Sequence, residues 1–260
     1  MTIGLLLVFS VYGVSLYFIN AEAKISTILV SAASSLKPVL EEITPIYEQA
    51  NPKVKITYNF GASGSLEQQL EQGATADVFI AASAEHIEIL HLQNLLIYDT
   101  KKIIAANRLA LVVPTSSHFN DLTRLTIDDF IDLTKDEVQQ LTIGDPRTVA
   151  AGKYAQEVLE KSGIWQKIQP KLALAQDARA ILVAVEKNDT DAGIMYLTDA
   201  RTSDLVTVVK ISPTDLHSPI IYPAVVLKSS RQQKIARSYI DFLGSKLVQD
   251  ILEKYSFKVS

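Results

Sequence analysis

Serine hydroxyls recur where apolar segments of this sequence give way to helical ones. Ser34 and Ser35 follow the apolar run at 28–30 and precede an amphipathic segment. Such a junction places a hydroxyl beside the first N–H groups of a helix, which have no partner within the helix and carry partial positive charge. The construction returns at Gly61–Ser65 and Val149–Gly152. One such serine alone is most simply a helix cap, but the recurrence favours an anion site.

Two of these segments partly match catalytic motifs. Ser34–Lys37 has the S-x-x-K spacing of penicillin-interacting enzymes, but no S-D-N or K-T-G triplet follows it. Gly61–Ser65 differs from the G-x-S-x-G nucleophile elbow at its last position. A hydrolase using Ser63 or Ser34 is therefore the alternative function. It would need a histidine such as His217, whose polar, proline-flanked surroundings predict a surface loop.

Metal-ligating patterns are weak in this sequence. His86 and His91 are five residues apart, whereas pairs of metal ligands on a helix are spaced three or four residues apart. We therefore expect both to be solvated surface histidines. The acidic residues between 128 and 137 lack the glycine and spacing of a calcium loop and indicate a solvated face. The sequence thus predicts neither a protein-bound metal ion nor a cofactor.

Composition excludes other classes of function. The 260 residues carry a formal net charge of −4 and no cysteine, and 48% of them are apolar. With a pI near 5.6, the chain has no electrostatic footprint for nucleic acid and no basic helix for a membrane surface. A globular body of one large domain or two lobes is expected.

The N-terminus has the pattern of an export signal. Ile3–Ile19 is mainly apolar and is followed by the small-x-small site Ala21–Ala23, which predicts a signal peptide over residues 1–23. No Lys or Arg precedes the apolar stretch, so an uncleaved anchor or a misplaced start codon is the alternative. Without a cysteine to carry lipid, we expect the mature protein to be free in the periplasm.

The rest of the chain alternates between strand and helix patterns. Residues 54–60 alternate apolar with polar as a strand does, and 36–46 carry an apolar helical stripe that Pro45 should kink or shorten. The alternation predicts mainly parallel sheets with helices on both faces. In such sheets ligands collect outside the carboxyl ends of strands. Five residues lie near such ends: Ser35, Ser63, Ala151, Ala178 and Tyr196.

Four stretches of the mature chain carry a family resemblance: AASSL at 32–36, FGASGSLEQQLEQGATADVFIAA at 60–82, IGDPRTVAAGKYA at 143–155 and GIMYLTDA at 193–200. Through them the chain resembles the periplasmic molybdate-binding proteins that serve ABC importers. The resemblance implies a non-catalytic protein with the type II periplasmic-binding-protein fold. Its lobes would be 24–107 with 220–260, and 108–219, with the ligand cleft between them.

The resemblance also implies a site, a ligand and a partner. Ser35 and Ser63 would bind a molybdate or tungstate oxyanion through hydroxyl and backbone N–H, Ala151 and Ala178 through backbone N–H, and Tyr196 through its hydroxyl. The partner would be the importer's membrane permease, and we expect a monomer.

Three positions depart from the family pattern, and the donor set narrows the ligand. The family often has proline at Ala150, valine at Ala178 and aspartate at Ser83. The first two positions lie at or beside a main-chain donor, whose N–H is kept. All five proposed groups donate and none is a carboxylate, which suits a fully ionised molybdate, tungstate or sulfate and disfavours a protonated phosphate. They are also neutral, which predicts an affinity nearly independent of pH between about 6 and 8.

Overall fold

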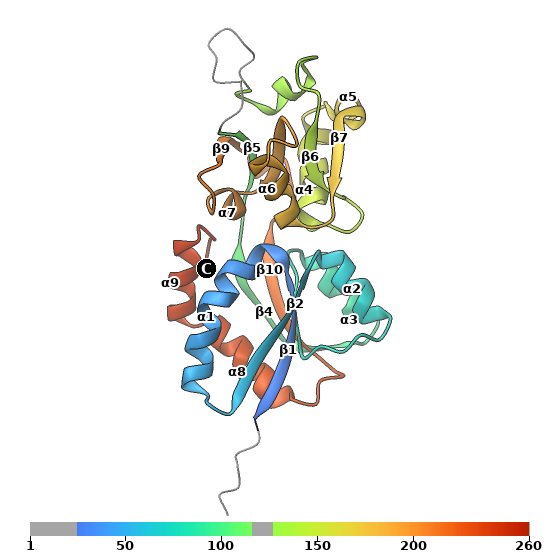
Figure 1. Cartoon of the computed structure of the whole chain (residues 1–260). Coiled ribbons are helices and arrows are strands. Elements are labelled where there is room, and N and C mark those ends of the chain that lie inside the picture. Colours follow the sequence, from blue (N-terminus) through green and yellow to red (C-terminus); the bar gives the residue numbers. More distant parts are fainter. Residues whose placement is uncertain (1–24, 116–126, 260) are drawn as a thin grey trace, which may run out of the picture.

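The chain forms two lobes, each built on a five-stranded sheet (Figure 1). The computed structural model describes residues 25–115 and 127–259, so the signal-peptide prediction lies outside the described residues. Lobe 1 holds, in spatial order, β2 (Val54–Gly61), β1 (Ser26–Ala33), β3 (Val78–Ile80), β10 (Ile221–Leu227) and β4 (Leu96–Ala106). Lobe 2 holds β7 (Leu172–Ala175), β6 (Leu141–Gly144), β8 (Ala192–Tyr196), β5 (Leu109–Pro114) and β9 (Val206–Ile211).

One strand of each sheet runs against the other four. β1 is parallel to β2 and β3, and β6 is parallel to β7 and β8. β10 and β5 are antiparallel to both of their neighbours. These two strands enter their sheets from the other lobe, so they begin at the edge where the remaining strands end. The two-lobed α/β fold expected from the sequence is confirmed, with mixed sheets because of this reversal.

Helices cover both faces of the lobe 1 sheet. Val78 and Ile80 of β3 lie in a core shared with α1 and α8, whereas Phe79 lies in a second core with residues of α2 and α3. This alternation is the period-two pattern of a strand buried on both faces. The helices of lobe 1 are the 3₁₀ helix η1 (Ser34–Leu36), α1 (Lys37–Ala50), α2 (Ser63–Glu71), α3 (Ala84–Leu92), α8 (Gln233–Leu243) and α9 (Lys246–Lys254).

The described helices of lobe 2 are η3 (Phe130–Thr134), α4 (Ala150–Lys161), α5 (Trp165–Ile168), η4 (Gln169–Lys171), α6 (Ala178–Glu186) and α7 (Leu197–Ala200). Most of them are single turns, and α4 and α6 are the longer ones. Asp177 caps α6 by accepting from the Ala180 N–H at 2.9 Å, as its position in the sequence predicts. Among residues 25–115 and 127–259, no helix is long and apolar enough to span a membrane.

The chain crosses between the lobes twice. It leaves lobe 1 after β4, at residues 107–108, and returns between β9 and β10, at residues 212–220. Figure 1 shows both crossings side by side at the junction of the lobes. The carboxyl ends of β1 and β2 therefore face those of β6, β7 and β8 across this junction.

Candidate functional site

The two predicted serines lie in the first turns of helices that follow neighbouring strands. Ser35 is the second residue of η1, directly after β1, and Ser63 is the first residue of α2, one residue after β2. Both are buried, at 3% and 2% exposure. Because first-turn N–H groups have no intrahelical partner, each position offers a backbone donor as well as a hydroxyl.

The lobe 2 residues occupy equivalent positions. Ala151 is the second residue of α4 and Ala178 the first residue of α6, while Tyr196 ends β8. The Tyr196 hydroxyl is buried and has no hydrogen-bond partner among the described residues. Burial raises the pKa of Tyr196 well above its ordinary value, so the hydroxyl keeps its hydrogen and is a donor.

All five residues line a single cavity between the lobes. About 190 Å³ of space lies among its lining residues, part of it open solvent. The other lining residues are small or apolar: Ala33, Ser34, Gly61, Ala62, Ala82, Val149 and Ala150. None of the lining residues carries a charge at neutral pH, so any attraction for an anion comes from hydroxyls, backbone N–H groups and helix dipoles.

Each of the two serine hydroxyls has a hydrogen-bond partner within lobe 1, and the bond to Ser63 leaves the Ser63 hydrogen free for a ligand. Ser63 Oγ accepts from the Ala82 N–H at 2.9 Å, so one of its two lone pairs is engaged by lobe 1 itself. Ser35 Oγ lies 3.0 Å from the hydroxyl of Tyr222, which is fully buried beneath the cavity. A hydroxyl whose lone pair is engaged within the protein donates outward, which suits a ligand that only accepts.

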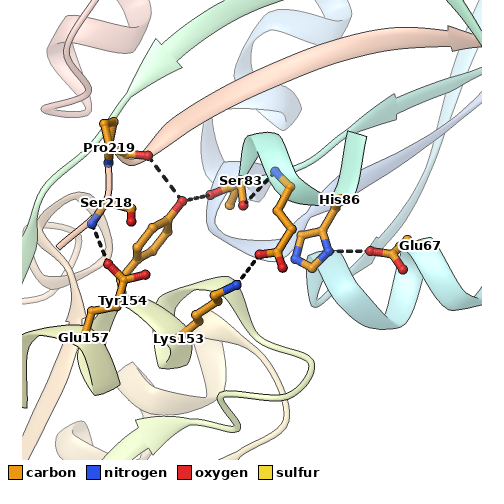
Figure 2. Close-up of polar contacts among 10 residues, drawn as sticks. Glu67, Ser83, His86, Lys153, Tyr154, Glu157, Ser218 and Pro219 are labelled. Atoms are coloured by element: carbon orange, nitrogen blue, oxygen red, sulfur yellow. Dashed lines mark hydrogen bonds and ion pairs between the residues drawn. The ribbon is translucent and has the colours of Figure 1, made fainter. Parts of the chain in front are cut away.

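Direct contacts hold the lobes together around this cavity. The Gly64 N–H of lobe 1 donates to the Thr148 carbonyl of lobe 2 at 3.0 Å. Figure 2 shows Lys153 and Tyr154 of α4 pointing toward the start of α3. Lys153 pairs with Glu85, and the Tyr154 hydroxyl lies 3.3 Å from the Ala82 carbonyl oxygen. The structure therefore has the lobes closed on the site.

Comparison with known proteins gives the family. The sequence pattern of the family described as bacterial extracellular solute-binding protein matches residues 28–258. This chain belongs to that family. The molybdate-binding protein ModA of Haemophilus influenzae is 34% identical over 237 residues, which are 91% of this chain and 91% of that protein. The putative ABC transporter substrate-binding lipoprotein YvgL of Bacillus subtilis is 33% identical over 238 residues, covering 92% and 88%.

A solved structure supports the same assignment. The substrate binding domain of a putative molybdenum ABC transporter from Clostridium difficile is 36% identical, with a TM-score of 0.68. The match covers 90% of this chain and 99% of that one. As a member of this family the chain is a solute-binding protein and not an enzyme, as the sequence predicts.

The geometry of the cavity also argues against the alternative function of a serine hydrolase. None of the described histidines lines the cavity with Ser63 or Ser34. His217 lies in the loop between β9 and β10, as expected, and its neighbours Asp215 and Ser218 are exposed. Its own side chain is nevertheless buried: it is 5% exposed and packs edge-on against the Tyr154 ring, with its Nδ1 2.8 Å from the Ser218 carbonyl oxygen. Contacts from a helix sixty residues earlier in the chain bury it.

His86 also differs from the expectation of a solvated histidine. Its side chain is 13% exposed, and its Nδ1 lies 2.5 Å from a carboxylate oxygen of Glu67 (Figure 2). Burial raises the pKa of Glu67, and the hydrogen bond from His86 opposes this. No group of three or more potential metal ligands occurs in the part of the chain that the structure describes.

Sequence reasoning missed one buried acid behind the site. Asp199, in α7, is 1% exposed, and burial raises its pKa to about 7 although Arg179 lies 3.4 Å away. Its second carboxylate oxygen has no partner among the described residues. The sequence did offer a signal for it: Asp199 lies three positions after Tyr196, a predicted ligand residue, in the stretch GIMYLTDA.

Proposed function

We propose that this chain captures molybdate, and tungstate in the same way, in the cavity between its lobes. The observation that carries the proposal is the convergence of donors without acceptors. Ser35, Ser63, Ala151, Ala178 and Tyr196 all line one buried cavity, and no lining residue bears a negative charge. The names of the relatives from H. influenzae and C. difficile support molybdenum as the element carried.

The energetics require this number of donors. Burying an ionised group without compensation costs several kcal/mol or more, whereas a single helix N-terminus returns about 0.3 to 1 kcal/mol. Each hydrogen bond to a charged group is worth about 1.5 to 3 kcal/mol net. Donors from five positions can therefore reach the roughly −8 kcal/mol of micromolar binding, whereas a single helix N-terminus cannot.

The same donor set ranks the possible anions. Molybdate, tungstate and sulfate are acceptors at every oxygen, so all three match the cavity in hydrogen-bonding chemistry. Phosphate near neutral pH keeps at least one hydrogen, which would meet donors only. Sulfate is thus the alternative ligand, distinguished from molybdate by size alone.

Membership of the family supports a biological role for this protein. We propose that the protein is exported to the periplasm by a signal peptide over residues 1–23 and passes its ligand to the membrane permease of an ABC importer. It would work as a monomer, without a cofactor. Lobe 1 would comprise 24–107 with 220–260 and lobe 2 would comprise 108–219, hinging at the two crossings so that the lobes open and close on the ligand.

Calorimetry with purified protein tests this proposal. Molybdate and tungstate should bind at micromolar concentration or tighter, sulfate more weakly, and phosphate least. Ser35→Ala together with Ser63→Ala should weaken molybdate binding strongly, each change costing about 1 to 3 kcal/mol. Ser230→Ala is the matched control, because Ser230 is a buried lobe 1 serine whose hydroxyl bonds Asp77 away from the cavity. Absence of binding to any of the metal oxyanions would refute the proposal.

A further inference from the structure

A chain of buried side chains leads from the crossing between the lobes to Ser35. Asn107, in the first crossing, donates from Nδ2 to the Tyr222 hydroxyl at 3.0 Å and to Thr198 Oγ1 at 2.8 Å. Its Oδ1 accepts from the Arg108 N–H at 2.8 Å. Tyr222, in β10, then lies 3.0 Å from Ser35 Oγ. Neither Asn107 nor Tyr222 lines the ligand cavity.

Counting hydrogens shows which group donates in each hydrogen bond between Asn107, Tyr222 and Ser35. The amide of Asn107 has two hydrogens and uses one for Thr198 and one for Tyr222, while the Arg108 N–H fixes which end of the amide is the oxygen. Asn107 therefore cannot accept from Tyr222. Among the described residues, Ser35 Oγ is the acceptor left for the Tyr222 hydrogen. Because leaving that hydrogen unpaired in the interior is costly, Tyr222 donates to Ser35.

This direction decides what Ser35 presents to the ligand. With a lone pair engaged by Tyr222, the Ser35 hydroxyl hydrogen points into the cavity, as that of Ser63 does because the Ala82 N–H engages its oxygen. We propose that Tyr222 and Asn107 are positioning residues that hold Ser35 as a donor and thereby set selectivity against anions that carry a hydrogen. The inference rests on the proposed function and names the residues that tune the same site.

Tyr222→Phe tests the inference through selectivity. The change removes the Tyr222 hydroxyl and keeps the ring, so the Ser35 hydroxyl is free to rotate and can turn a lone pair toward the hydrogen of phosphate. Competition calorimetry at about pH 8, above the second pKa of a phosphate group, compares two dianions of equal charge. We expect phosphate to bind more tightly and molybdate slightly more weakly, so that the ratio of their affinities narrows about tenfold. A purely structural defect would weaken both anions alike.

Two further variants complete the test. Tyr239→Phe removes a buried hydroxyl that bonds Tyr58 in the lobe 1 core, and it should leave the ratio unchanged. Asn107→Asp offers Tyr222 an acceptor, which would reverse the chain so that Ser35 donates to Tyr222 and shows a lone pair to the cavity. The new charge repels the two dianions equally and so leaves the ratio of their affinities unaffected. We therefore expect the reversed hydrogen bonds of this variant to narrow the ratio as well.

The outcomes separate this inference from the proposed function. If the wild-type protein binds molybdate but the ratio is unchanged in Tyr222→Phe and Asn107→Asp, the positioning role is wrong and the proposed function stands. If the wild-type protein binds none of the oxyanions, both fail. A narrowed ratio in Tyr239→Phe as well would assign the effect to general loosening and overturn the inference.

Discussion

Gly64→Ala should weaken ligand binding by separating the lobes. A Cβ atom at Gly64 would lie 2.8 Å from the carbonyl oxygen of Thr148 and 3.1 Å from its Cα, both backbone atoms of the opposite lobe. Neither of these Thr148 atoms can move away unless lobe 2 moves with it. Overpacking of this kind costs about 1 to 3 kcal/mol, and it acts in the closed arrangement alone. At 1.4 kcal/mol for each factor of ten, molybdate affinity should fall about 5- to 150-fold.

Calorimetry and ligand-free thermal unfolding together check this prediction. The melting temperature without ligand should change little, because the lobes can relieve the contact by opening. Gly244→Ala is the control: its Cβ would lie 2.8 Å from Cδ of Lys102, a flexible side chain that can move aside, and it is remote from the cavity. Unchanged affinity in Gly64→Ala, with the fold intact, would show that the closed arrangement is not the form that binds.

Three further predictions concern single groups and the ligand itself. Tyr196→Phe removes a buried hydroxyl without a partner, so ligand-free stability should hold or rise while molybdate affinity drops about tenfold, measured by unfolding and calorimetry. Molybdate at a thousand times its dissociation constant should stabilise the protein by about 4 kcal/mol; a flat thermal shift would contradict oxyanion binding. Asp199 has a folded pKa of about 7 against an ordinary value of 3.8, so stability should fall as pH rises between these values, and Asp199→Asn should flatten that part of the profile of melting temperature against pH.

The strand-to-helix junctions were predictable because their signals are local. An apolar run, then small residues or hydroxyls, then a helical stripe defines each junction without knowledge of distant contacts. The rule that ligands gather at the carboxyl ends of strands then selected Ser35, Ser63 and Tyr196, which the structure brings to one cavity. Their role as ligand donors stays a prediction until binding is measured.

Features that depend on distant contacts escaped the sequence analysis. His217 is buried by the Tyr154 ring, and His86 by its partner Glu67 on a neighbouring helix. Pro45 does not end its helix, since α1 continues to Ala50 and buries Tyr47 beyond the proline. In each case tertiary packing outweighs a local preference, and no spacing along the chain records that packing.

The buried acid changes the expected pH dependence of binding. Neutral donors alone predicted an affinity independent of pH between about 6 and 8, but Asp199 titrates near pH 7 one helical turn from Tyr196 and interacts electrostatically with it. A dianion in the cavity would favour the protonated form of that carboxyl, so binding should take up protons and weaken as pH rises through about 7. Asp199→Asn should restore a flat profile. A flat profile in the wild-type protein would mean that Asp199 is too well screened by Arg179 to sense the ligand, and that closure and donor geometry alone set the affinity.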